Sequence, residues 1–490
     1  MSGADASPAA RPLVLSLVSH TNVGKTTLAR TLLRREVGEV FDQAHVTDQT
    51  ETFVLLDRED GAQVVLADTP GFGDSARLLR RLHGMANPVG WLVAQVWDRF
   101  AERALFCSQQ AVRHVRDESD AVLYLVNASE DPEAAGYAAA ELEILEWIAR
   151  PVIVLLNQTG APGDAGARGL DEARWRSWAA SRSCVRQVLS LDAFTRCWVQ
   201  EGALLEHIRD ALPVERREPA DALLERWREE NLAVLDRSIE AMAELVGGAV
   251  ADGEPVGPGR LGRLERRRAA DALAHRLEDR IAETNERLIA LHGLSGEAAE
   301  ELRVGLEDVS APGDRPPPWQ RSVLGGLVGG ALGGLAADIA TGGLSFGGGA
   351  VAGAILGAAG LGGLAWGYES LGGAQAPRVA WSSEFLERLG SDTLLRYLAV
   401  AHFGRGAGAF QARVAPAAWR EGVQRALAPR REILLGAIRR ARTDPRPDGA
   451  RDAALEMRES LGGAVRELLA ELYPESAPLL GLAGRRALPA

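Results

Sequence analysis

Short apolar runs alternate with longer amphipathic segments over residues 13–212. The runs are rich in β-branched residues, as strands buried on both faces of a parallel sheet are. They comprise Leu13–Val18, Val64–Ala67, Ala121–Val126, Val152–Leu156 and Val185–Leu189. Helical segments, including residues 25–35 and 134–149, separate most of them. The alternation predicts a doubly wound α/β domain, and the surplus helical sequence between residues 75 and 120 predicts an insertion in it.

After Pro213 the apolar positions recur with the period of a helix. Leu223 and Trp227 begin one such stripe, and Leu273 and Leu277 begin another that is surrounded by arginine and glutamate. The pattern predicts a mainly α-helical region, with helices at residues 221–246, 264–292, 383–402, 417–442 and 450–473. Stretches that resemble hinges separate them at residues 253–259, 311–318 and 443–449.

A segment of unusual composition, residues 322–368, interrupts the helical region. It carries a single charge, Asp338, and glycine pairs recur regularly from Gly325 to Gly334 on one face of a helix. Small residues at that spacing let two helices approach closely, as in membrane helix pairs. Each half, residues 322–340 and 350–367, would be roughly 27 Å long, close to the thickness of a hydrocarbon core. The segment favours a membrane hairpin; the alternative is a pair of helices buried in a protein core.

Composition and charge narrow the functional classes. The net charge of −12 argues against a broad nucleic-acid-binding face. The three cysteines show no metal-ligand or redox spacing, which favours a reducing compartment. Residues 1–11 lack the apolar run of a secretory signal, so we expect a cytoplasmic location. The eight histidines have no nucleophile or metal partner by spacing, and we interpret them as structural or solvent-exposed.

Lys25 is the only lysine in the chain, since the other basic residues among the 55 are arginines. Arginine therefore serves wherever this protein needs only a positive charge. Lys25 lies in the run Ser19-His-Thr-Asn-Val-Gly-Lys-Thr26, between a predicted strand and a predicted helix. A compact ammonium on a flexible stem is what the lysine of a phosphate loop offers to the β- and γ-phosphates of a nucleotide, and a planar guanidinium does not fit the same space. The sequence predicts this role for Lys25.

Two motifs at strand ends predict a site for a nucleoside triphosphate and Mg²⁺. The run around Lys25 matches the phosphate-loop pattern GxxxxGK followed by Ser or Thr, except that Ser19 stands at the first glycine. That change keeps the backbone amides that surround the phosphates. Thr26 is expected to ligate Mg²⁺ through its hydroxyl. The later run Asp68-Thr-Pro-Gly71 offers an aspartate for the water shell of the metal and a Gly71 amide for the γ-phosphate.

These residues resemble the Era/TrmE-type translation-factor-related GTPases, whose phosphate loop commonly carries Asn-Val-Gly-Lys, here residues 22–25. The resemblance implies that residues 38–48 form switch I and that Thr47 binds Mg²⁺ and the γ-phosphate in the loaded state. It makes Asn22 the candidate ligand of a potassium ion that replaces an arginine finger. Phe72 stands where Ras-like proteins place the glutamine that positions water, which implies slow hydrolysis until a partner or an ion completes the site.

The guanine-recognition motif of these GTPases, Asn-Lys-x-Asp, is incomplete in this chain. The run Asn157-Gln-Thr-Gly160 keeps the asparagine but lacks the lysine and the aspartate that selects guanine. The later run Val188–Phe194, with Leu191, matches the last base-contacting loop weakly. The expected nucleotide contacts are Ser19, Asn22, Val23, Gly24, Lys25, Thr26, Thr27, Asn157, Gln158 and Leu191. The expected catalytic residues are Lys25, Thr47, Asp68 and Gly71.

The whole arrangement resembles a bacterial subfamily in which an Era-type GTPase domain precedes a domain of unknown function. The expected domains are a GTPase domain (1–212), a helical domain (213–320), a glycine-rich hairpin (321–370) and a C-terminal helical domain (371–490). The implied function is a switch that binds and hydrolyses GTP with Mg²⁺ and potassium. The hairpin would tether it to the cytoplasmic face of the inner membrane.

Two alternatives remain open at this point. One is a soluble GTPase associated with the ribosome or tRNA, and the other is a nucleotide-binding scaffold with little hydrolysis. The acidic balance disfavours nucleic acid as a partner. An unidentified protein partner is expected, and a homodimer stays open.

Overall fold

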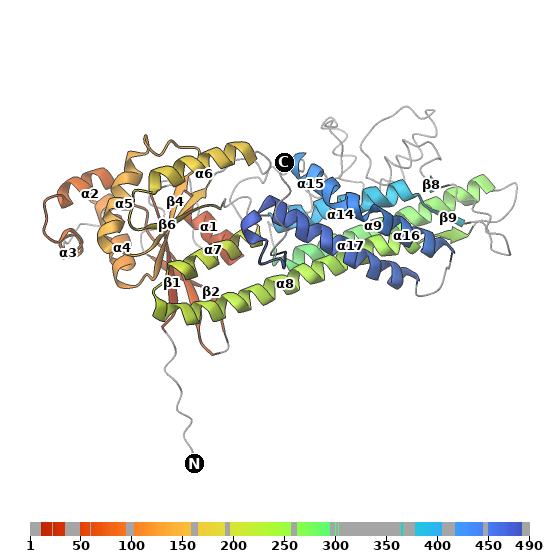
Figure 1. The fold of residues 1–490 in the computed structure, drawn as a ribbon, viewed down its shortest axis with the longest axis horizontal. Coiled ribbons are helices and arrows are strands. Elements are labelled where there is room, and N and C mark those ends of the chain that lie inside the picture. Colours follow the sequence, from red (N-terminus) through yellow and green to blue (C-terminus); the bar gives the residue numbers. More distant parts are fainter. Residues whose placement is uncertain are drawn as a thin grey trace, which may run out of the picture. The chain divides into compact units, whose positions relative to one another are not determined.

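The computed structural model describes residues 11–21, 23–34, 50–58, 60–94, 102–157, 165–191, 197–255, 262–294, 299, 302, 364–365, 378–403, 417–443 and 449–482. The chain divides into two compact units, and Figure 1 shows the helices and strands of both. Unit 1 comprises Met1–Leu232, His402–Phe410 and Glu475–Gly481. Unit 2 comprises Ala233–Ala401, Gln411–Pro474 and Leu482–Ala490.

Unit 1 is built on a six-stranded sheet with the order β2-β3-β1-β4-β5-β6. The strands are β1 (Leu13–Ser19), β2 (Glu51–Asp57), β3 (Gln63–Asp68), β4 (Ala121–Asn127), β5 (Val152–Asn157) and β6 (Val185–Ser190). All neighbouring pairs are parallel except β2 with β3. The predicted α/β fold with a mainly parallel sheet is confirmed. The prediction missed β2, an antiparallel edge strand that is exposed or half-buried along its length.

Helices cover both faces of this sheet (Figure 1). One face is covered by α1 (Lys25–Leu33), α7 (Trp198–Ala211) and the beginning of α8 (Val214–Ala251). The other is covered by α2 (Ser75–Leu82), α3 (Pro88–Ala94), α4 (Arg103–Asp117), α5 (Gly136–Ile148) and α6 (Ala165–Ala179). Successive residues of β4 serve the two cores in turn, because side chains of a strand alternate between its faces. Three helices, α2 to α4, lie between β3 and β4, where the sequence predicts additional helices.

A buried carboxylate fixes the beginning of α8 to the sheet of unit 1. Asp120 Oδ2 accepts hydrogen bonds from Val14 N and from Arg216 Nη2, both at 2.9 Å. Arg216 Nε donates to the other carboxylate oxygen at 3.2 Å. Asp120 is 8% exposed, and the Arg216 side chain is 20% exposed. Because both oxygens are used, the pair defines the geometry of this junction.

We expect Asp120→Ala to lower the free energy of unfolding by about 2–3 kcal/mol, because it leaves the Val14 amide and the Arg216 guanidinium without their acceptor. Urea unfolding of the full chain measures the loss. The matched control is Asp117→Ala, which removes an exposed carboxylate paired with Arg116 and is expected to cost below about 0.5 kcal/mol. Equal losses in the two variants would contradict a structural role for the Asp120 pair.

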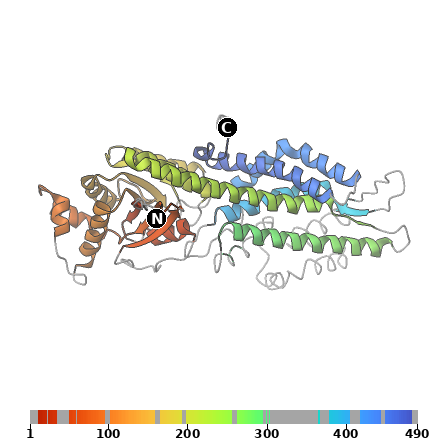
Figure 2. The same ribbon diagram turned by 90° about the horizontal axis from the view of Figure 1, so that it is seen from below.

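Unit 2 is mainly helical, as predicted. Its helices are the later part of α8, α9 (Gly262–Leu291), α14 (Ser383–Ala401), α15 (Ala417–Leu427), α16 (Arg431–Thr443) and α17 (Gly449–Leu472). In Figure 2 the helices of unit 2 lie side by side. The segment predicted as one helix at 417–442 is two helices, separated by a 3₁₀ turn at Ala428–Arg430. Pro429 explains the break, because proline lacks an amide hydrogen and clashes with the preceding turn of an α-helix.

A small three-stranded sheet joins distant parts of unit 2. Its order is β7 (Glu254–Pro255), β9 (Arg378–Trp381) and β8 (Leu364–Ala365). Because β8 pairs with β9, the helix predicted over residues 350–367 is wrong at Leu364 and Ala365. The rest of the predicted hairpin lies outside the described residues. Among the residues that the structure describes, no helix is both long enough and apolar enough to cross a membrane.

Candidate functional site

A tight loop leads from the carboxyl end of β1 into α1. Gly24, the residue before α1, has a φ of 95°, in the left-handed region that favours glycine. A Cβ atom there would also lie 2.8 Å from Asn157 Nδ2, so the position requires glycine for space as well. No side chain of the described residues caps the N-terminus of α1. The first amides of this helix can therefore bind an anion such as a phosphate.

Lys25, the first residue of α1, lies buried with its amine close to the end of β1. Its Nζ donates a hydrogen bond to Ser19 Oγ at 3.1 Å, and the residue is 8% exposed. Burial lowers the pKa of the Lys25 amine, and the charges of Asp68 and Glu141 oppose that shift. A Cβ atom on Gly71 would lie 3.1 Å from Nζ, so the amine has little free space. A phosphate bound at this loop would stabilise the charged form of Lys25.

Thr26 and Asp68 bring together oxygen atoms that suit Mg²⁺. Thr26 Oγ1 donates to Asp68 Oδ2 at 2.7 Å, and the buried Oδ1 has no hydrogen-bond partner among the described residues. Burial raises the pKa of Asp68, and Lys25 opposes that shift. No group of three or more His, Cys, Asp or Glu side chains in the described part of the chain could hold a metal ion. Mg²⁺ often takes one or two protein oxygens together with waters and phosphate oxygens, so the pair fits this ion.

The chain after β3 packs against the phosphate loop. Thr69 Oγ1 donates to Leu17 O at 2.6 Å, and Phe72 N donates to Ser19 O at 2.9 Å. The Phe72 side chain is buried in the core that contains α2 to α6. Phe72 is therefore a packing residue, and its effect on hydrolysis stays a prediction.

The ends of β5 and β6 lie on the same edge of the sheet as the phosphate loop. Asn157 is buried, and its Nδ2 donates to Val23 O at 2.8 Å. Leu191 N donates to Leu156 O at 3.1 Å, and the Leu191 side chain is buried. The side chain of Asn157 thus supports the phosphate loop directly, a contact that the sequence motif did not indicate.

The structure brings together most of the predicted site residues that it describes. Contacts at the loop join Ser19, Val23, Gly24, Lys25, Thr26, Asp68, Gly71 and Asn157. Thr27 is buried within α1. Asn22, Thr47, Gln158 and all of the predicted switch I (38–48) lie outside the described residues, so their roles stay predictions.

The sequence analysis missed a buried carboxylate beside the loop. Glu141 of α5 is fully buried and contacts His20, Ser75 and Tyr124. His20 has no acidic residue nearby in the sequence, so spacing along the chain predicts no partner for it. The available signal was a glutamate on the buried side of the helix predicted at residues 134–149.

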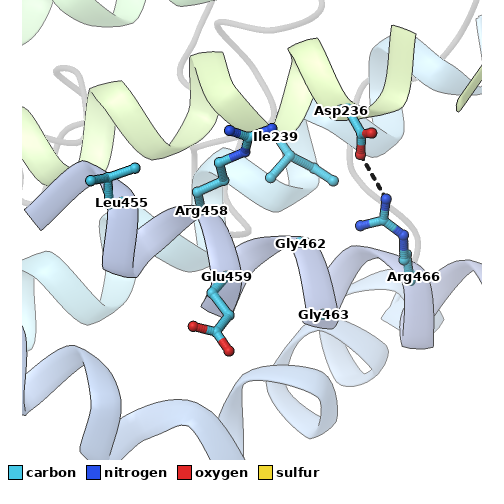
Figure 3. A pocket seen from close by; sticks show the side chains of 8 residues that line it. All are labelled: Asp236, Ile239, Leu455, Arg458, Glu459, Gly462, Gly463 and Arg466. Carbon is cyan, nitrogen blue, oxygen red and sulfur yellow. Dashed lines mark hydrogen bonds and ion pairs between the residues drawn. The ribbon is translucent and has the colours of Figure 1, made fainter. Parts of the chain in front are cut away.

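Unit 2 contains a cavity of about 350 Å³ between α8 and α17, shown in Figure 3. Its lining mixes charged, apolar and glycine residues: Asp236, Ile239, Leu455, Arg458, Glu459, Gly462, Gly463 and Arg466. Arg466 Nη2 and Asp236 Oδ1 form an ion pair at 2.6 Å. The lining residues include no nucleophile and no set of metal ligands, so we assign no chemistry to this cavity.

Two family models match the chain. Residues 14–158 match a model described as 50S ribosome-binding GTPase, and residues 179–462 match a domain of unknown function, DUF3482. A search of curated proteins finds no match.

Solved structures of Era are similar to part of the chain. Era of Aquifex aeolicus bound to GDP and aluminium fluoride is 20% identical, with a TM-score of 0.31, and the match covers 42% of this chain and 58% of that one. Era in complex with MgGDPNP and part of 16S ribosomal RNA is 19% identical, with a TM-score of 0.30, and the match covers 41% of this chain and 57% of that one. The chain thus spans less than two thirds of the length of these Era structures.

Proposed function

Because this chain belongs to the DUF3482 family and carries an Era-like GTPase domain in its N-terminal part, we propose that it binds GTP and hydrolyses it to GDP. One observation carries the proposal. The buried Lys25 amine at the N-terminus of α1 lies beside the Thr26–Asp68 pair, whose remaining oxygen is unpartnered among the described residues. A cation, the backbone amides at the start of α1 and hard oxygen atoms at one edge of the sheet suit a triphosphate with Mg²⁺.

Each group at the loop has a defined task in this proposal. The amides at the start of α1 and the Lys25 amine bind the β- and γ-phosphates. Thr26 and Asp68 hold Mg²⁺, which when bound neutralises charge on the phosphates. The Gly71 amide contacts the γ-phosphate. Because catalysis of phosphoryl transfer is mainly positioning and electrostatic stabilisation, these groups suffice for slow hydrolysis.

Faster hydrolysis needs a group that positions water or stabilises charge, and the apolar side chain of Phe72 does not supply one. We propose that Thr47 completes the Mg²⁺ and γ-phosphate contacts, and that a potassium ion at Asn22 or a protein partner supplies the missing charge. Phosphate release measured with Mg²⁺ in potassium and in sodium buffers tests the function. Absence of Mg²⁺-dependent binding of any nucleoside triphosphate would overturn it.

Nucleotide selectivity gives a quantitative prediction. A site built to hydrogen-bond its substrate rejects analogues by about 10⁴–10⁵. With glycine at position 160 in place of the base-reading aspartate, we expect GTP to be preferred over ATP by less than about 10³. Competition of labelled GTP by ATP and ITP measures the ratio. A ratio at the upper value would show that another residue reads the base.

Two hypotheses for this GTPase differ in the cellular partner that they expect. The description of the matched family, 50S ribosome-binding GTPase, supports a ribosomal partner. The glycine-rich hairpin predicted at 321–370 supports a membrane tether. This hairpin and the division of the chain into four domains both remain predictions from the sequence. Sedimentation of the protein loaded with a non-hydrolysable GTP analogue separates them, since one hypothesis expects it with 50S subunits and the other with inner-membrane vesicles.

A further inference from the structure

A fully buried carboxylate links the phosphate loop to the segment after Asp68. Glu141 Oε1 accepts a hydrogen bond from Ser75 Oγ at 2.5 Å and lies 2.8 Å from His20 Nδ1. Its Oε2 accepts a hydrogen bond from Tyr124 OH at 2.8 Å. The three partners come from three elements: the loop after β1, the first residue of α2 and the middle of β4. One carboxylate thus contacts the phosphate loop, the start of α2 and the sheet.

Burial of the Glu141 carboxylate costs desolvation free energy, and the hydrogen bonds and ring contacts around it offset this cost. The imidazole of His20 lies 2.8 Å from this carboxylate, and the His20 side chain is 31% exposed. The His20 ring stacks on Tyr137 with 4.5 Å between ring centroids, and Tyr137 OH donates to Glu130 at 2.6 Å. An apolar side chain of similar size would fill the space at a lower desolvation cost. The carboxylate therefore contributes a defined geometry, because a fully satisfied buried network allows few arrangements.

The segment held by Glu141 is the one that faces the expected γ-phosphate. Phe72 N donates to Ser19 O at 2.9 Å, and Gly73 N donates to Ser108 Oγ at 3.2 Å. Gly71 lies at the near end of this stretch, where an added Cβ atom would lie 3.1 Å from Lys25 Nζ. Ser75 lies at its far end and is held by Glu141. Ser75 is therefore the far anchor of a segment whose near part is hydrogen-bonded to the phosphate loop.

We propose that Glu141 is a positioning residue for hydrolysis, which holds Ser75 and His20 so that residues 71–75 stay fixed against the phosphate loop. This inference rests on the proposed GTPase function. Among the described residues of the loop, Glu141 hydrogen-bonds to His20, and Glu141 is not one of the residues expected to contact the phosphates. Its loss should therefore slow the chemical step and leave nucleotide affinity nearly unchanged.

Two variants test the proposal, and each deletes one hydroxyl group that donates a hydrogen bond to the Glu141 carboxylate. Ser75→Ala removes the hydrogen bond to the segment, and Tyr124→Phe removes the hydrogen bond to the sheet. We expect Ser75→Ala to lower kcat about 10–100-fold with KM for GTP within about threefold, because small misplacements of reacting groups have effects of this size. Tyr124→Phe should keep kcat within about twofold. Equal kcat values for the two variants would overturn the proposal, since a merely structural carboxylate would respond to both alike.

Variants on α5 provide the matched comparison. Glu141→Met keeps the approximate size of the side chain, removes both acceptor oxygens and should reproduce the loss of kcat in Ser75→Ala. The variant that combines the Glu141 and Ser75 changes should lose little more kcat than either alone, because both changes remove the same hydrogen bond. Glu143→Gln lies on the same helix and removes a carboxylate paired with the exposed His83 at 3.2 Å. It should hydrolyse GTP at the wild-type rate.

Amide hydrogen exchange separates failure of this inference from failure of the proposed function. In the nucleotide-free full chain, exchange in residues 71–75 should be at least about tenfold faster in Ser75→Ala and Glu141→Met than in wild type, Tyr124→Phe or Glu143→Gln. This readout needs no hydrolysis. Unchanged exchange in both Ser75→Ala and Glu141→Met would overturn the positioning role, whether or not the wild type hydrolyses GTP.

Discussion

Replacing Lys25 with arginine is expected to abolish triphosphate binding almost as completely as replacing it with alanine. The amine is buried, lies 3.1 Å from Ser19 Oγ and would be only 3.1 Å from a Cβ atom on Gly71. A guanidinium is larger and planar, so it cannot enter this space without displacing the loop. We expect affinity for GTP to fall by about 10²-fold or more in both variants. Titration with a fluorescent GTP analogue measures the loss.

The reverse exchange on the same helix is the matched control. Arg30→Lys lies in the last turn of α1, away from the phosphate loop, and should leave the affinity within about twofold of wild type. Thermal unfolding of nucleotide-free Lys25→Arg and wild type checks that the fold survives. Hydrolysis by Lys25→Arg within about twofold of wild type would show that the single lysine of the chain has no special role.

Asp68→Asn should separate nucleotide binding from use of Mg²⁺. The change keeps the shape of the side chain and its contact with Thr26 but removes the charge that attracts the metal. We expect the Mg²⁺ concentration for half-maximal hydrolysis to rise about 10–100-fold and kcat to fall about 10²-fold. Binding of GDP without Mg²⁺ should change by less than about threefold, because Lys25 and the helix amides remain.

Asp74→Asn is the matched control for this experiment. Asp74 accepts a hydrogen bond from Arg77 N as the N-cap of α2, and asparagine caps helices about as well. Its Mg²⁺ dependence should equal that of the wild type. A wild-type Mg²⁺ requirement in Asp68→Asn would mean that Asp68 Oδ1, which has no hydrogen-bond partner among the described residues, does not face the metal.

Local signals in the sequence were enough for the phosphate loop and most of the sheet. The residues from Ser19 to Thr26 are contiguous, so their order along the chain already places a loop before a helix N-terminus. The inner strands are apolar on both faces, which separates them from the helices around them. The edge strand β2 escaped detection because it is not buried on both faces. The helix predicted over residues 350–367 was wrong at Leu364 and Ala365, because the pairing of these residues with β9 is a tertiary contact that helical periodicity does not report.

The sequence by itself thus determined the α/β class, the phosphate loop, its single lysine and the helical character of the second half of the chain. Only the tertiary structure decided which distant side chains meet at that loop. Asp68 meets Thr26, Asn157 meets Val23, and Glu141 meets His20 across 121 residues. These contacts depend on the strand order β3-β1-β4-β5, which aligns the carboxyl ends of the parallel strands at one edge. Local periodicity does not encode that order, because each strand is compatible with several neighbours until the packing of the whole sheet selects one.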